Sequence, residues 1–166
     1  LTFEKYLSQG YYYLFTASLF SSKYRGGDGM IRSSRYNRNY VMNLLAGKEW
    51  FAGKSRNNIL GAGIRFSYLG GDRFIPVNMY QSVEQEDIVE DIERAYTKRL
   101  PDSPIMSFSL SYRINKPNHS GIWTLQVINA LAHKEFQEFE FNSESKTVDE
   151  VKDLIVIPSI SYKIEF

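Results

Sequence analysis

The sequence contains no cysteine, which excludes a disulfide framework, a zinc–thiolate site and a cysteine nucleophile. An excess of charge of one sign is also missing, because 20 basic residues face 19 acidic ones and leave a formal net charge of +1. This balance argues against a nucleic-acid partner, since proteins that bind nucleic acids usually carry a basic surface. No stretch approaches the roughly 18 consecutive apolar residues of a transmembrane helix. With 166 residues, 43% of them hydrophobic, the chain is one folded domain rather than a disordered segment.

Motifs for catalysis and cofactor binding are lacking as well. The sequence has no Gly-x-Ser-x-Gly elbow, no P-loop and no His-Glu-x-x-His helix. Gly61 and Gly63 do not complete a dinucleotide fingerprint, because position 66 is phenylalanine. His119 and His133 have no second histidine or carboxylate at metal-ligand spacing. The sequence therefore predicts a protein that is not an enzyme and that has no cofactor or metal site.

What the sequence has in abundance is alternation of apolar and polar residues with a period of two. At 106–114, large apolar residues alternate with Ser107, Ser109, Ser111 and Arg113. Such a pattern is typical of a strand with one apolar and one polar face. The first strand is expected to begin before Leu1, as in a fragment or processed chain. The pattern predicts an all-β, antiparallel up-and-down meander of seven strands at 1–7, 11–22, 40–50, 60–68, 106–114, 122–131 and 156–166.

The predicted connections alternate in length, and this asymmetry is typical of an outer-membrane β-barrel. Aromatic residues near the strand ends suit the girdles at the two membrane interfaces. A soluble barrel or sandwich produces the same alternation with its apolar face turned inward, so the loops and the C-terminus favour the membrane barrel. We therefore expect the chain to lie in the cell outer membrane, with the lipid bilayer and lipopolysaccharide as its surroundings. The short connections are 8–10, 51–58 and 115–121, and the long ones are 23–39, 70–103 and 132–153.

The C-terminal strand places Ile160, Tyr162, Ile164 and Phe166 at alternate positions. A terminal phenylalanine after such an alternation resembles the assembly signal of bacterial outer-membrane barrels. In those proteins the barrel insertion machinery reads the signal as a strand edge. The resemblance implies this machinery as a partner.

Further segments resemble the C-terminal barrel of Bacteroidetes-type TonB-dependent receptors. The most specific of them is Asn-Leu-Leu-Ala-Gly-Lys-Glu at 43–49. The others are Gly-Tyr-Tyr-Tyr-Leu-Phe-Thr-Ala-Ser-Leu-Phe at 10–20, Ser-Lys-Tyr at 22–24, Arg-Tyr-Asn-Arg-Asn-Tyr at 35–40, Leu-Gly-Gly-Asp-Arg at 69–73 continuing to Pro76, and Ser-Tyr-Arg-Ile-Asn at 111–115.

This resemblance implies a barrel of the 22-stranded type closed by an N-terminal plug, of which residues 1–166 are the last seven strands. The plug, the TonB-coupling box and the earlier strands are absent from the sequence. Energised uptake of a small nutrient (a siderophore, glycan, peptide or metal chelate) would belong to the parent protein, which contacts TonB through its plug. Four polar residues of the strands would face the lumen and meet the plug: Glu49, Arg65, Arg113 and Lys163.

The long connection 70–103 carries six acidic residues within ten positions. Ile88, Ile92, Tyr96 and Leu100 follow a helical spacing there, which predicts a short amphipathic helix with its acids in solvent. The acids lack the ordered spacing of a calcium loop. The segment is a candidate ligand-contacting lid over the barrel mouth, with Glu84, Glu86, Asp87, Glu90, Asp91 and Glu93 as its acidic residues.

The long connection 23–39 is basic, with Asp28 as its single acid. On an extracellular rim its cations would meet either lipopolysaccharide phosphates or the neighbouring acidic loop, and ordinary solvated charge is the simpler interpretation. The basic residues are Lys23, Arg25, Arg32, Arg35 and Arg38.

Two other functions remain open. One is a small self-contained outer-membrane barrel for adhesion or membrane stability, since eight-stranded barrels have a similar length. An eighth complete strand would favour it. The other is a soluble ligand-binding β-barrel, which would dissolve without detergent.

Overall fold

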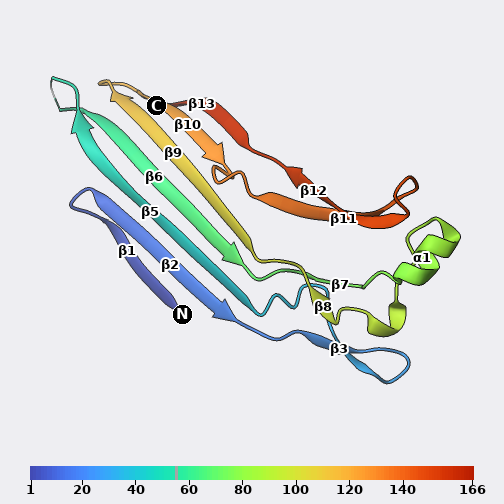
Figure 1. Ribbon diagram of the computed structural model, residues 1–166. Coiled ribbons are helices and arrows are strands. Elements are labelled where there is room, and N and C mark those ends of the chain that lie inside the picture. The colour runs from blue at the N-terminus through green and yellow to red at the C-terminus, as the bar shows by residue number, and fades with distance from the viewer. Residues whose placement is uncertain (55) are drawn as a thin grey trace.

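The computed structural model describes residues 1–54 and 56–166, and its main feature is one antiparallel sheet of seven strands (Figure 1). These strands lie side by side in chain order, so each pairs with the strand before it in the meander. The seven predicted strands are confirmed as β1 (Thr2–Ser8), β2 (Tyr11–Leu19), β5 (Tyr40–Ala52), β6 (Asn58–Leu69), β9 (Ser103–Asn115), β10 (Ser120–Ile128) and β13 (Ile157–Glu165).

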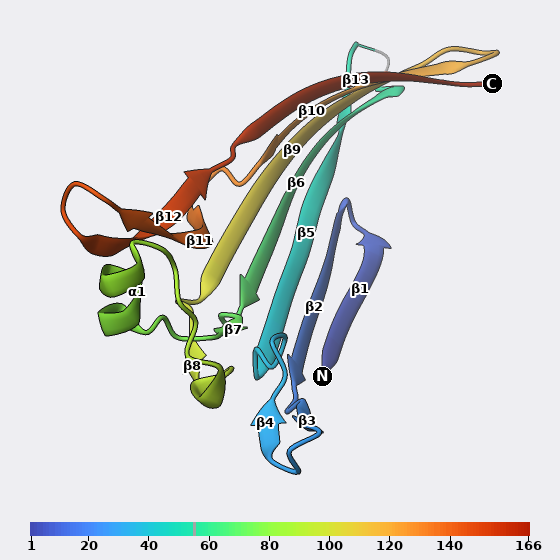
Figure 2. The ribbon, with the colours of Figure 1, turned by 90° about the vertical axis from the view of Figure 1, so that its right-hand side faces the viewer.

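The sheet is open. Strands β1 and β13 are its two edges, and within the described residues they do not pair with each other. Figure 2 shows the seven strands curving together in one direction. The all-β meander is thus confirmed, whereas no closed barrel forms within the described part of the chain.

The strand register separates the sheet into two faces. Tyr13 is opposite Ala46, which is opposite Ile64, and this row continues to Phe108. Because directly opposed residues point to the same side, one face collects most of the large aromatic and aliphatic residues of the strands. The next row along the strands contains Gly47, Gly63 and Ser109 and belongs to the other face. We call the two surfaces the apolar face and the polar face.

None of the other elements that the structure describes covers the apolar face. Ala95 is the single buried hydrophobic residue in the described ranges, and it lies outside the sheet. On the apolar face, Phe108 is 46% exposed, Leu110 47% and Trp123 48%. The sheet therefore has no hydrophobic core of its own on this side.

Smaller elements gather beyond one end of the sheet, opposite the short turns (Figure 1). Neither of the two helices found in residues 1–54 and 56–166 has the length and hydropathy needed to cross a membrane. The elements are the hairpins β3 (Lys23–Arg25) with β4 (Ile31–Ser33) and β11 (Lys134–Asn142) with β12 (Thr147–Leu154), the strand pair β7 (Arg73–Phe74) with β8 (Lys98–Arg99), the helix α1 (Met79–Gln85) and the 3-10 turn η1 (Ile92–Arg94).

The hairpin β11–β12 was expected to be an irregular loop, and this expectation is wrong. The register shifts between Phe136 and Glu138, so a β-bulge interrupts the alternation that would have revealed a strand. Phe136 and Phe139 are three residues apart, yet their ring centroids lie 4.9 Å from each other. The hairpin extends strands β10 and β13 beyond the end of the main sheet (Figure 1).

Asn129 forms the joint between this hairpin and the sheet. Its Nδ2 donates to the carbonyls of His133 at 2.9 Å and Ile155 at 3.0 Å, and its Oδ1 accepts from the His133 amide at 3.1 Å. The side chain is buried, and its φ of 55° is in the left-handed region that asparagine tolerates. One amide thus joins both strands of the hairpin at the point where they leave the sheet.

The predicted amphipathic helix is also misplaced. The helix α1 ends before the predicted stripe, because Glu86 adopts a left-handed conformation with a φ of 55°. The chain then runs back beside α1, where the Val89 amide donates to the buried Ser82 hydroxyl at 2.9 Å. Ile88 and Leu100 are therefore not on one helix. The i, i+4 spacing of apolar residues predicted a helix, but the chain reverses its direction after the left-handed residue Glu86.

Replacing Asn129 by alanine should loosen the β11–β12 hairpin. The substitution removes three hydrogen bonds and puts alanine at a positive φ, which together should cost roughly 1–3 kcal/mol of local stability. Hydrogen exchange at the His133 amide should accelerate, while Asn118→Ala in the exposed β9–β10 turn should leave it unchanged. Equal exchange in both variants would contradict the role of Asn129 as a joint.

Candidate functional site

The long connections 23–39 and 70–103 meet at two glycines that follow strand β6. A Cβ atom on Gly70 would collide with the carbonyl of Arg38, and one on Gly71 would collide with the carbonyl of Leu100. The Gly70 amide donates to the carbonyl of Tyr40 at 3.1 Å. Only glycine lets the backbones approach this closely, so these positions hold the loop junction together.

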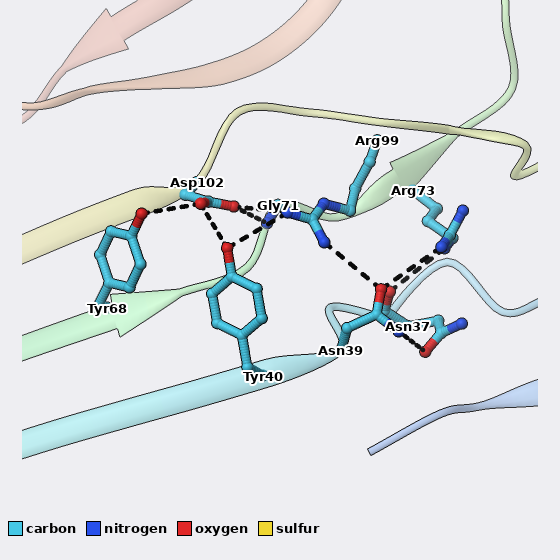
Figure 3. A network of polar contacts seen from close by, with 8 residues as sticks. All are labelled: Asn37, Asn39, Tyr40, Tyr68, Gly71, Arg73, Arg99 and Asp102. Carbon is cyan, nitrogen blue, oxygen red and sulfur yellow. Dashed lines mark hydrogen bonds and ion pairs between the residues drawn. The ribbon is translucent and has the colours of Figure 1, made fainter. Parts of the chain in front are cut away.

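Asp102 is the polar centre of this junction (Figure 3). Its Oδ2 accepts hydrogen bonds from the hydroxyls of Tyr40 at 2.5 Å and Tyr68 at 2.8 Å. Its Oδ1 accepts from the Gly71 amide at 3.3 Å and from Arg99 at 2.9 Å. One carboxylate therefore links strands β5 and β6 to the loop that precedes β9.

These hydrogen bonds stabilise the ionised carboxylate. The Tyr40 hydroxyl, and then Tyr68, the Gly71 amide and the Arg99 charge, lower the pKa of Asp102 below its ordinary value of 3.8, although partial burial opposes them. Asp102 is consequently a permanent anion at neutral pH, and it serves as an acceptor rather than as a proton donor.

Two arginines connect the same loops. Arg38 forms a bidentate ion pair with Asp72, with Nε–Oδ1 at 2.5 Å and Nη2–Oδ2 at 2.9 Å. Arg73 donates to the carbonyls of Asn37 at 3.3 Å and Tyr96 at 3.3 Å. The basic connection 23–39 thus contacts the connection 70–103, which was one of its two expected partners. The ion pair between them uses Asp72 and not one of the six predicted lid acids.

A groove lies between this junction and the β11–β12 hairpin, and we call it the loop groove. It consists of two adjoining pockets of about 370 and 530 Å³ that share Asp72, Leu100 and Phe136. The first pocket also touches Leu69 and Ser103, which are opposite each other on the polar face. The loop groove therefore opens toward the polar face of the sheet.

The lining of the loop groove combines aromatic, cationic and anionic side chains. Phe74 and Phe139 provide an aromatic wall, with ring centroids 5.3 Å apart. Cations and anions occur on both sides, and no group of acidic or histidine side chains in residues 1–54 and 56–166 is arranged to hold a metal ion. Such a lining suits an organic ligand with both apolar and charged groups. The charged residues are Arg35, Arg38, Asp72, Arg73, Glu90, Lys134, Glu135, Glu138 and Lys152.

The six predicted lid acids do not form one cluster. Glu90 alone lines the loop groove. Glu86 pairs with Lys146 at the tip of the β11–β12 hairpin, and Asp91 caps η1 and pairs with Arg94. Asp87 accepts from the amide of Ile88, while Glu84 and Glu93 are exposed on α1 and η1.

The four residues expected in a lumen share the polar face. Glu49 is opposite Gly61, and Arg65 is opposite Ser107, in separate rows of the register. Arg113 and Lys163 both pair with Glu165, a residue that the sequence interpretation had not selected. The shared face is thus settled by the register, while contact with a plug remains a prediction.

The proposed assembly signal lies on the edge strand β13. Trp123 is opposite Tyr162, and Leu125 is opposite Ile160, so both signal residues point to the apolar face together with Ile164. Phe166 is fully exposed after the strand, and its ring centroid lies 6.5 Å from that of His119. Recognition by insertion machinery stays a prediction.

The sequence interpretation missed Asp102 and its two tyrosines. It had selected the segments 35–40 and 69–73 for their resemblance to a family, and the structure brings these segments together through the Arg38–Asp72 pair. The signal that the sequence offered for this contact was the glycine pair at 70–71 together with the opposite charges of Arg38 and Asp72. No family model, curated protein or solved structure matches this chain.

Gly71→Ala should disrupt the loop junction. The added methyl group would displace the backbone of Leu100, an overpacking expected to cost roughly 1–3 kcal/mol. Protease cleavage within 72–101 should therefore accelerate. Gly27→Ala is the matched control, because nothing lies within 4 Å of a Cβ there. Equal cleavage of the two variants would contradict the close approach.

The junction should respond to pH through Asp102. Because its pKa is lowered in the folded state, its stabilising contribution is present above the ordinary carboxyl value and is lost as pH falls below it. The protection of the Gly71 amide from hydrogen exchange should persist to about pH 4 and decline under more acidic conditions. Asp102→Asn should show lower protection at neutral pH and no such decline. A decline well above pH 4 in the unmodified protein would contradict the assignment.

Proposed function

We propose that residues 1–166 form the C-terminal portion of an outer-membrane β-barrel of the TonB-dependent receptor type. The parent protein would take up a scarce nutrient through energised rearrangement of its plug. In this proposal the chain is not an enzyme. It contributes the last seven strands, a polar lumen wall and part of the ligand-contacting mouth.

The uncovered apolar face is the observation that carries the proposal. Seven adjacent strands present large hydrophobic side chains to one side, and no described layer packs on them. Leaving this area in water would forgo about 25 cal/mol for each Å² of apolar surface. A bilayer removes that cost, provided that all backbone groups are paired within the protein.

The two open edges support a larger barrel. The outer sides of β1 and β13 need strand partners, because unpaired backbone groups are costly in lipid. Earlier strands of a parent protein would supply these partners. The barrel insertion machinery would recognise β13 during assembly, and lipopolysaccharide would surround the long loops.

The polar face and the loop groove support a transport role. Small and polar residues such as Gly63 and Ser109 leave room on the side that would face the lumen. The loop groove opens onto the same side and would meet the ligand first. A path from the mouth into the lumen is thus lined by polar side chains, including those expected to contact the plug.

The alternatives fit fewer observations. A small self-contained barrel would require closure, but the main sheet has seven strands and two free edges. A soluble ligand-binding barrel would require the apolar face to enclose a core, yet the described residues bury one hydrophobic side chain.

Labelling of strand β9 tests the proposal. In a cysteine-free background of the full-length protein in native membranes, Phe108→Cys and Leu110→Cys should react with a membrane-soluble maleimide. Ser107→Cys and Ser109→Cys should instead react with a charged, water-soluble maleimide, because they lie on the opposite face. The reverse pattern, or water access at all four positions, would exclude a lipid-facing apolar face.

The mass of the native protein in the same membranes distinguishes a receptor from a small self-contained barrel. A native product several times larger than the 19.3 kDa of this chain supports the receptor. A product of about this mass excludes it.

A further inference from the structure

The apolar face carries two positive charges near its turn end. These charges belong to Lys5 and Lys48. At the paired positions of the seven described strands, the apolar face carries no other charged residue. Neither forms an ion pair with any described residue. An ammonium group on a surface that otherwise suits hydrocarbon needs an anion or water within reach.

Tyr11 lies on strand β2, between the strands that carry the two lysines. The Lys5 Nζ lies 3.5 Å from the centroid of the Tyr11 ring, and Lys48 is directly opposite Tyr11 in the strand register. The Lys48 Nζ lies 5.4 Å from the centroid of the Trp50 ring. Aromatic rings hold both cations at the sheet surface, and they satisfy neither charge fully.

A notch of about 520 Å³ in the apolar face begins at Lys48. Its floor contains the small residues Ala46 and Ala62, which are neighbours on strands β5 and β6. Its walls include Tyr13 and Phe108, which stand in the same cross-strand row as Ala46. Large side chains around two alanines thus leave an apolar hollow that Lys48 lines directly. Tyr11 lines it as well, so Lys5, which lies over the Tyr11 ring, is beside it.

We propose that this notch binds one phospholipid, with its phosphate between Lys5 and Lys48 and an acyl chain over Ala46 and Ala62. The proposal rests on the proposed function, since it requires the apolar face to lie in a bilayer. Charge complementarity selects the occupant, because an anionic head joined to an apolar tail matches both parts of the site.

The height of the site along the strands fits this occupant. Tyr11 is the first residue of β2 after the turn at Gln9 and Gly10, so the cations lie where the strands leave the hydrocarbon. Tyrosine and tryptophan are typical of that level. The notch occupies two neighbouring cross-strand rows, the first with Tyr11 and Lys48 and the second with Ala46 and Phe108. The second row lies farther from the turns, toward the middle of the bilayer.

Lipid titration of the full-length protein in detergent, followed by native mass spectrometry, tests the site. Each basic residue near a lipid headgroup contributes about fivefold in affinity, so Lys5→Gln with Lys48→Gln should weaken phosphatidylglycerol binding by about thirtyfold. Lys54→Gln with Lys116→Gln is the matched control, because it removes the same two charges from turns at the same end of the sheet. Diacylglycerol with the same chains should bind weakly to all variants. Unchanged phosphatidylglycerol binding by the double variant would overturn the proposal.

Photocrosslinking in native membranes separates failure of this site from failure of the proposed function. Benzoylphenylalanine would replace Phe108 at the notch in one variant and Leu125, remote from it on the same face, in another. Preferential capture of phospholipid at position 108 that the double lysine substitution abolishes supports the site. Equal capture at both positions, insensitive to the lysines, overturns the site and retains a lipid-facing surface. Absence of lipid at both positions overturns the proposed function as well.

Discussion

The backbone register between neighbouring antiparallel strands is the constraint on which the rest of this structure depends. Pairing of β5, β6 and β9 continues over most of their length without a shift, so alternate residues of all three strands stay on one side. A slip by one residue would exchange the two faces and mix charges with aromatic rings. The separation of an apolar face from a polar one is therefore a property of the hydrogen-bond ladder, and side-chain chemistry follows it.

Local alternation in the sequence was sufficient to predict the seven long strands and their faces, because each strand expresses its own period of two. The prediction failed where the period is broken or where the contact is remote. A bulge after Phe136 concealed strand β11, and a left-handed Glu86 ended α1 ahead of the apolar stripe. The Asp102 centre was missed for a different reason: Tyr40 lies 62 residues away in sequence, and only folding brings the two together.

The loop junction and the sheet support each other. The rings of Tyr40 and Tyr68 stack with centroids 6.0 Å apart, and their hydroxyls reach beyond the sheet to Asp102. The loop that carries Asp102 also contributes Leu100 to the loop groove. The shape of the groove is thus anchored in two strands by a single carboxylate. This arrangement gives a rigid base to a region built mostly from irregular backbone.

The agreement between the order of strands in the sheet and their order in the chain has a consequence for assembly and for evolution. Each long strand pairs with the one made just before it, so the sheet can grow by adding one hairpin at a time. The duplication or loss of a hairpin would leave the register of the remaining pairs intact. A sheet of this kind can change its width without redesign of its surfaces, and each added hairpin brings a new loop to the same end.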